Sequence, residues 1–279
     1  MECYDFKQVN FNNENNLLDY SVDATYVIHL ENNDRYDSII ENLKFFQPTK
    51  KVFILFNKGF KKCKKESHVN STNTDLVDSY LQIFNHSINN GFMNNILILE
   101  DDFFFNKKIL EKRVCNDINN FLLKHKNKEF LYYLGCVPFI QTKYSGNHNK
   151  MFVGCATHSV IYPKVIIDKI FYQMDRTKII DWDINSRNLT RYIYKTPLCY
   201  QLFPTTENTK SYFETSTFPL KLDVYFIMYL FKKLKLDENV DGYSILYYWS
   251  SIFFQILIII LVLILVLVLV LVFYLTRRR

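Results

Sequence analysis

The chain has 279 residues, of which 49% are hydrophobic, and a net charge of +6. This length suits one large α/β domain or at most two small ones. Its basic residues form only short clusters, between positions 61 and 65 and between positions 232 and 235. A nucleic-acid-binding face needs a broader basic stripe with stacking aromatic residues, so we expect no nucleic-acid partner.

The first part of the chain gives few structural signals. Residues 1–20 are rich in Asn and show no hydrophobic period, which predicts a loose N-terminal arm. They contain no apolar stretch typical of a signal peptide. The six cysteines of the chain are widely spaced without a C-x-x-C pair. This spacing does not indicate a zinc site, and we expect the cysteines to be buried, reduced thiols.

Strand-like and helix-like segments then alternate five times. Short apolar runs predict strands at 25–30, 51–56, 96–99, 129–135 and 155–162. Helical spacing and turn residues predict helices at 36–46, 74–90, 107–126 and 163–174. Because the joins are short, we predict an α/β domain over 21–218, with a mainly parallel sheet and helices on both faces.

An apolar run near the C-terminus follows this domain. Residues 252–275 contain Gln255 as their only strongly polar side chain. About 20 helical residues cross a bilayer, so the run predicts a C-terminal transmembrane helix with membrane lipid around it. The shorter apolar run 224–231 cannot span. It predicts a juxtamembrane helical segment within 219–245, packed in the core or lying on the membrane surface.

The orientation of this predicted anchor follows from conflicting signals. Without a signal peptide, the simplest outcome is tail-anchoring, with the large domain in the cytosol. Three C-terminal arginines beyond the span favour the opposite side, because positive residues prefer the cytoplasm. N-glycosylation sequons at Asn70, Asn85 and Asn188 would be modified only in that opposite orientation. In an Asn-rich chain we interpret them as chance and expect a cytosolic domain.

A run of three carboxylates is the main chemical signal. Glu100, Asp101 and Asp102 directly follow the apolar strand 96–99. Ligands of open α/β sheets bind at the carboxyl ends of strands. Adjacent carboxylates repel one another unless a cation compensates, and their oxygens select Mg²⁺ or Mn²⁺. The alternative is an acidic turn in water.

Two further places contain residues suited to catalysis. Asp181 and Asp183 form a D-x-D motif that could supply a base or a second metal ligand. His158 lies in the strand 155–162, where a lone histidine is more often a core residue than a catalyst. The G-x-S-x-G, G-x-G-x-x-G and P-loop motifs are absent from the sequence. This argues against a serine hydrolase, a Rossmann dehydrogenase and a P-loop enzyme.

The order of these segments resembles the family-25 glycosyltransferases, which include lipooligosaccharide and procollagen galactosyltransferases, and particularly divergent relatives from large DNA viruses. The resemblance extends over about 25–208. Its matching segments are 26–35, 96–102, 131–135, 157–162, 181–183 and 197–201. His29 stands where the family usually has Asn, and the arginine-rich turn of the family is reduced to Arg35.

The resemblance implies a GT-A-like fold and a membrane-anchored hexosyltransferase that inverts the anomeric carbon. A UDP-sugar would be the donor, and a hydroxyl of a glycan or glycoprotein the acceptor. Glu100, Asp101 and Asp102 would hold Mn²⁺ or Mg²⁺. The nucleotide would face His29, Leu30, Arg35 and Asp101. Asp181, Asp183 and His158 are the candidate catalytic residues. The alternatives are an inactive transferase-like membrane tether and a nucleotidyltransferase.

Overall fold

The computed structural model describes residues 3–11, 17–31, 33–177, 180–201, 225, 229, 232–236 and 240–277, with backbone alone at 181, 182, 185 and 240. A mixed sheet of seven strands forms the centre of the domain, in the order β1-β3-β2-β4-β7-β6-β8. These strands are β1 (Tyr4–Val9), β2 (Val22–Leu30), β3 (Val52–Asn57), β4 (Asn95–Glu100), β6 (Phe130–Ser145), β7 (His148–Pro163) and β8 (Thr190–Tyr194).

The predicted parallel arrangement is confirmed only for part of this sheet. β3, β2 and β4 run parallel, and their runs of Val, Ile and Leu are buried on both faces. β7 pairs antiparallel with β4, and β6 and β7 form a long antiparallel hairpin. The sequence pattern does not indicate this hairpin, because its turn near Gly146 lies between two predicted strands that are separate and much shorter.

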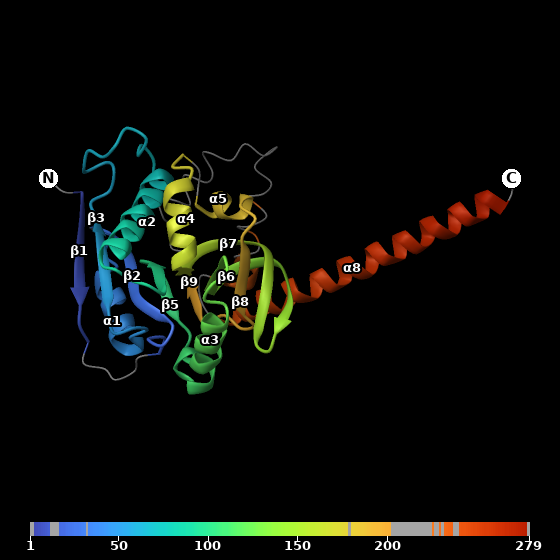
Figure 1. The fold of residues 1–279 in the computed structure, drawn as a ribbon, viewed down its shortest axis with the longest axis horizontal. Coiled ribbons are helices and arrows are strands. Elements are labelled where there is room, and N and C mark those ends of the chain that lie inside the picture. The colour runs from blue at the N-terminus through green and yellow to red at the C-terminus, as the bar shows by residue number, and fades with distance from the viewer. Residues whose placement is uncertain are drawn as a thin grey trace.

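Helices cover both faces of the sheet, as predicted (Figure 1). On one face, α2 (Thr72–Asn89), α4 (Lys164–Gln173) and α5 (Ile180–Ser186) pack their apolar side chains against the sheet. On the other face, α1 (Tyr36–Phe46) and α3 (Lys112–Lys124) do the same. The helix η1 (Lys107–Leu110) precedes α3. A two-stranded ribbon of β5 (Phe103–Phe105) and β9 (Cys199–Gln201) lies beside the end of β4.

The N-terminal segment corrects two predictions. Residues 4–9 are not a loose arm: β1 pairs antiparallel with β3 at the edge of the sheet. Phe6 stacks on the ring of His86, with ring centroids 4.0 Å apart, although its neighbours in the sequence are polar. The prediction of reduced thiols is also wrong for two cysteines, because Cys3 and Cys63 form a disulfide. The remaining four cysteines form no disulfide, and three of them are buried.

The C-terminal helix α8 (Val240–Arg277) projects from the domain (Figure 1) and is long and apolar enough to cross a membrane. Its first turns belong to the domain: Tyr243, Tyr247 and Ser250 are buried, and the helix packs on β6. A side chain at Gly242 would collide with the carbonyl of Leu234, so the close approach requires glycine. Most of the predicted juxtamembrane segment, including most of 224–231, lies outside the described residues.

Candidate functional site

The candidate site lies at the carboxyl ends of β2 and β4, which are neighbouring parallel strands, beside a small cavity that His29 lines, and is called the crevice below. Buried apolar residues bring both strands to this edge, where polar side chains follow: Glu31, Asn33, Asp34 and Arg35 after β2, and Asp101 and Asp102 after β4. Asp34 has a positive φ of 57°, so the backbone turns sharply at the mouth of the crevice. Such strained positions are concentrated at ligand sites.

Asp101 is held by groups of the protein itself. Its Oδ1 accepts a hydrogen bond from Nη1 of Arg35 at 2.5 Å. Its Oδ2 accepts from the backbone N–H of Leu30 at 3.2 Å and from the side-chain amide of Asn33. Both oxygens are therefore engaged. Asp101 therefore orients Arg35 and closes the turn after β2.

Asp102 has a different environment. Its carboxyl group is buried, Oδ2 accepts from Nε2 of Gln201 at 2.6 Å, and Nη1 of Arg35 lies 3.6 Å away. Oδ1 is buried and has no hydrogen-bond partner among the described residues. Burial, together with the nearby charge of Asp101, raises the pKa of Asp102 to about 7. A buried carboxylate with one unused oxygen is a ready ligand position.

His29 supplies a second unused atom to the same crevice. Its ring is buried between Tyr36 and Phe56, with Nδ1 3.9 Å from Oδ2 of Asp101. This Nδ1 is also without a hydrogen-bond partner within the described chain. Burial lowers the pKa of His29, so the ring is neutral near pH 7. His29 and Tyr36, with Asp34 and Asp37, line a small cavity of about 280 Å³.

Glu100 points away from Asp101 and Asp102. Its Oε1 accepts hydrogen bonds from the hydroxyls of Tyr80 at 3.1 Å and Thr157 at 2.9 Å, on the face that α2 covers. The three acidic residues therefore do not converge, and no group of three metal-binding side chains occurs within the described residues. Among the three, Asp102 has a buried carboxylate oxygen without a partner in the described part of the chain, so it is the residue that would hold Mg²⁺ or Mn²⁺.

The predicted catalytic residues lie elsewhere. Asp183 is buried in α5 and its Oδ2 pairs with Nε of Arg187 at 2.8 Å. Asp181 belongs to the same helix, and its side chain is outside the described residues. His158 is fully buried in β7, and burial lowers its pKa to about 4. A side chain at Gly135 would collide with His158 and Cys199, so His158 occupies the core and not a substrate-facing position.

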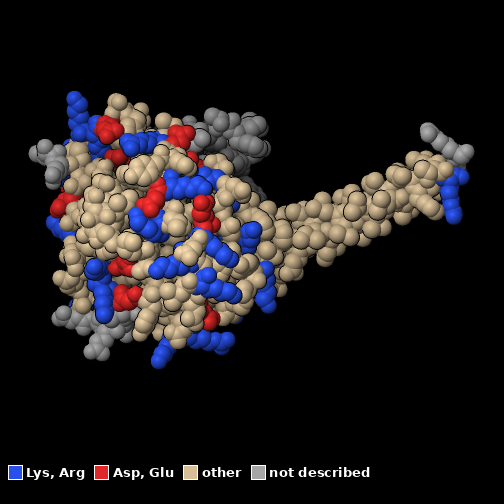
Figure 2. Space-filling view, viewed as in Figure 1, with Lys and Arg blue, Asp and Glu red and all other residues tan. Residues whose placement is uncertain are grey.

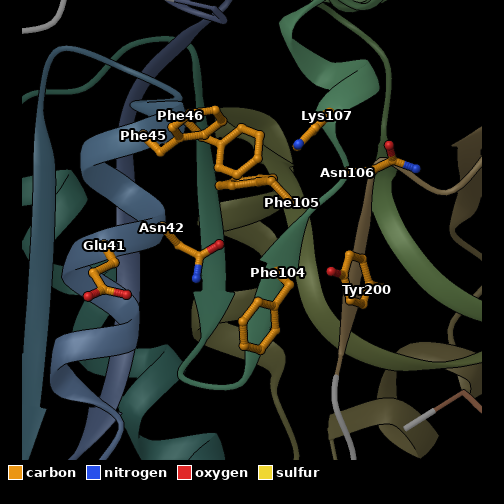
Figure 3. A pocket seen from close by; sticks show the side chains of 9 residues that line it. All are labelled: Glu41, Asn42, Phe45, Phe46, Phe104, Phe105, Asn106, Lys107 and Tyr200. Atoms are coloured by element: carbon orange, nitrogen blue, oxygen red, sulfur yellow. The ribbon is translucent and has the colours of Figure 1, made fainter. Parts of the chain in front are cut away.

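A larger cavity of about 520 Å³ lies between the β5–β9 ribbon and α1 (Figure 3). Phe104 and Tyr200 stack across the ribbon, with centroids 5.7 Å apart, next to the Asp102–Gln201 pair in sequence. The opposite wall comes from α1. The lining residues are Glu41, Asn42, Phe45, Phe46, Phe104, Phe105, Asn106, Lys107 and Tyr200.

The C-terminal helix α8 also contacts the crevice. The hydroxyl of Tyr243 in α8 donates to the backbone carbonyl of Gln201 at 2.9 Å and accepts from its N–H at 3.3 Å. Gln201 in turn donates to Asp102. The sequence alone assigns no role to Asn33, Gln201 or Tyr243. Gln201 lies 99 residues from Asp102 in the sequence, and no local sequence pattern predicts a contact between residues so far apart.

Comparison with known proteins gives no family for this chain: no protein-family model matches it, and neither does any curated protein. The fold is a mixed α/β domain with one long apolar C-terminal helix.

Proposed function

We propose that the protein is a membrane-anchored glycosyltransferase that uses a nucleotide-sugar donor, most simply a UDP-sugar, with Mn²⁺ or Mg²⁺. The observation that carries this proposal is a pair of buried polar atoms at the same edge of the sheet, Oδ1 of Asp102 and Nδ1 of His29, which have no hydrogen-bond partner among the described residues. Buried polar groups in folded proteins are nearly always satisfied, and a bound ligand would satisfy these two. A GT-A-like relationship and an inverting outcome are part of the same proposal.

The charges of the crevice suit a diphosphate that carries a divalent cation. Asp102 would bind the cation, and the guanidinium of Arg35, fixed by Asp101, stands beside it. The cation would supply Lewis-acid stabilisation of the departing nucleoside diphosphate. Tyr36 and the neutral ring of His29 provide an aromatic wall against which a nucleobase can pack. Leu30 and Asn33 keep the loop after β2 in position through Asp101.

The cavity beyond the ribbon suits a sugar ring. The C–H faces of a pyranose are apolar and pack on aromatic rings such as Phe104 and Tyr200. Hydroxyl groups of the sugar would meet the polar side chains of Asn42 and Asn106. Glu41 is the one carboxylate that lines this cavity among the described residues, so we propose it as the base for the acceptor hydroxyl. It replaces Asp183, whose carboxylate is paired within α5.

The test uses the full chain in detergent micelles. UDP release from a panel of UDP-sugars is measured with and without Mn²⁺, and UDP binding is followed by calorimetry. We expect metal-dependent binding in the micromolar range and metal-stimulated release from at least one sugar. Asp168→Asn, at an exposed carboxylate that pairs with Lys164 one turn away in α4, is the matched control for changes at Asp102.

The two alternatives give different results in the same experiments. A transferase-like tether without activity binds no nucleotide sugar, so silence across the whole panel would overturn the proposal. A nucleotidyltransferase would consume a nucleoside triphosphate and release pyrophosphate. Product analysis after incubation with nucleoside triphosphates and with sugar nucleotides separates this reaction from sugar transfer.

A further inference from the structure

The disulfide between Cys3 and Cys63 bears on the side of the membrane that the domain occupies. It joins the start of β1 to the loop after β3, across 60 residues. Disulfides persist in oxidising compartments and are rare in the cytosol, where thiols are kept reduced. Of the four cysteines outside the disulfide, three are buried and the fourth is half-buried. The disulfide at the edge of the sheet therefore favours an oxidising compartment for the domain.

The three N-glycosylation sequons give an independent indication. Asn70 lies just before α2, Asn85 lies on the outer face of α2, and Asn188 lies between α5 and β8. All three asparagine side chains are exposed, so each can carry a glycan without disturbing the core. N-linked glycans are surface features of secreted or lumenal domains.

The charges that flank the apolar span do not favour either side. Lys232, Lys233 and Lys235 precede the span on the side of the domain, and three arginines follow it. The positive-inside tendency is therefore balanced. Because the first turns of α8 pack on β6, the domain and the N-terminal end of the span must lie on the same side of the membrane. The side on which the disulfide forms is then the side of the whole domain.

We propose that the domain lies on the exoplasmic side of its membrane, in an oxidising compartment, and is N-glycosylated at one or more of Asn70, Asn85 and Asn188. This reverses the cytosolic placement expected from sequence. In disulfide formation, the two thiols lose two protons and two electrons to an exchanging protein disulfide, which is reduced to two thiols. In glycosylation, the asparagine amide nitrogen loses a proton and bonds the anomeric carbon of a lipid-linked oligosaccharide, whose lipid diphosphate leaves.

The test expresses the full chain in eukaryotic cells. Treatment with an amide-cleaving glycosidase should raise its gel mobility, and the shift should vanish when all three asparagines are changed to Gln. Thr72→Ala removes the sequon at Asn70, whereas Thr72→Ser preserves it and is the matched control. In sealed vesicles, added protease should leave the domain intact, and alkylation without reductant should leave Cys3 and Cys63 unlabelled.

Two results would overturn the proposal. One is unchanged mobility of the wild-type chain after glycosidase treatment. The other is digestion of the domain in sealed vesicles, which would place it in the cytosol. None of these readouts uses enzymatic activity, so they stand or fall separately from the proposed transferase function.

Discussion

Two clusters of buried charge lie at the ends of neighbouring strands, and they differ in whether all their polar atoms have hydrogen-bond partners. At the end of β3, Nζ of Lys65 contacts Asp75, Oδ1 of Asn57 at 2.6 Å and the hydroxyl of Tyr4 at 2.7 Å. Asp75 also accepts from Asn57 and from the backbone of Phe60. At the ends of β2 and β4, Asp102 and His29 keep unused atoms.

The difference separates a structural network from a candidate site. Lys65 has three donors and three acceptors around them, so its network is closed and needs no ligand. The crevice also buries charged groups, but Oδ1 of Asp102 and Nδ1 of His29 have no hydrogen-bond partner among the described residues. A buried polar atom without a partner destabilises the fold, and such a loss is tolerated at a site where a bound ligand supplies the partner. Changes in the first cluster should therefore affect stability alone, and changes in the second should affect binding.

The largest effect is expected at Lys65. Lys65→Met keeps the apolar stem but leaves Asp75 buried without its cation, and this should lower the free energy of unfolding by about 3–5 kcal/mol. Chemical denaturation measures this. Lys64→Met, at an exposed neighbour, is the control and should change stability by less than about 0.5 kcal/mol. Equal stability of the two variants would show that the network is not structural.

Asp102→Asn should abolish the proposed activity. The amide removes the negative charge but preserves the shape, so metal-stimulated UDP release should fall by about a hundredfold or more. Asp168→Asn should retain the wild-type rate. Unchanged turnover of the Asp102 variant would refute the role of this carboxylate.

The same variant should show a pH-dependent gain in stability. The folded-state pKa of Asp102, about 7, lies above its unfolded value of 3.8, so the wild-type protein loses stability as pH rises from about 4 to 7. The amide introduced by the substitution does not titrate. The stability advantage of Asp102→Asn should therefore grow by on the order of 2 kcal/mol between pH 5 and pH 8. Melting curves at both values check this, and an advantage that shrinks with pH would contradict it.

The smallest effect is expected at Tyr243. Tyr243→Phe removes the hydroxyl that fixes the backbone of Gln201, and should reduce UDP release about tenfold while α8 stays helical. Tyr248→Phe, on the exposed side of the same helix, is the control. Equal rates for the two variants would show that α8 does not position the site.

The parallel centre of the domain is predictable from sequence because β3 and β4 contain uninterrupted apolar runs and β2 is apolar over most of its length. Helix 36–46 is confirmed as α1. β1 is missed because it has six residues and the polar pair Lys7 and Gln8 interrupts its alternation after Phe6, which leaves too short a pattern. β5 and β9 have three residues each, too few for a period. The disulfide and the Asp102–Gln201 pair join distant segments, and only the assembled fold brings these partners together.

For the site, the sequence places Asp102, Arg35 and His29 at one sheet edge, and the structure brings them together. The alternation of side chains between the faces of a strand separates Glu100 from Asp101, but the sequence does not show which face each one takes, and the structure turns Glu100 to the α2 face. Nor could the sequence show that Asp101 accepts hydrogen bonds from Arg35, Asn33 and Leu30, since that depends on the turn at Asp34.

In the proposed membrane-anchored enzyme, the continuity of α8 sets a distance between the site and the membrane surface. Tyr243 contacts the crevice, and the apolar run begins at Ile252, nine residues further along one helix. At 1.5 Å per residue, this places Tyr243 about 14 Å from the start of the span. Figure 2 shows mixed charges on the domain and an uncharged surface along the projecting helix up to its far end. In the proposed transferase, a site held this close to the span would favour acceptor groups near the lipid headgroups over acceptor groups farther from the membrane.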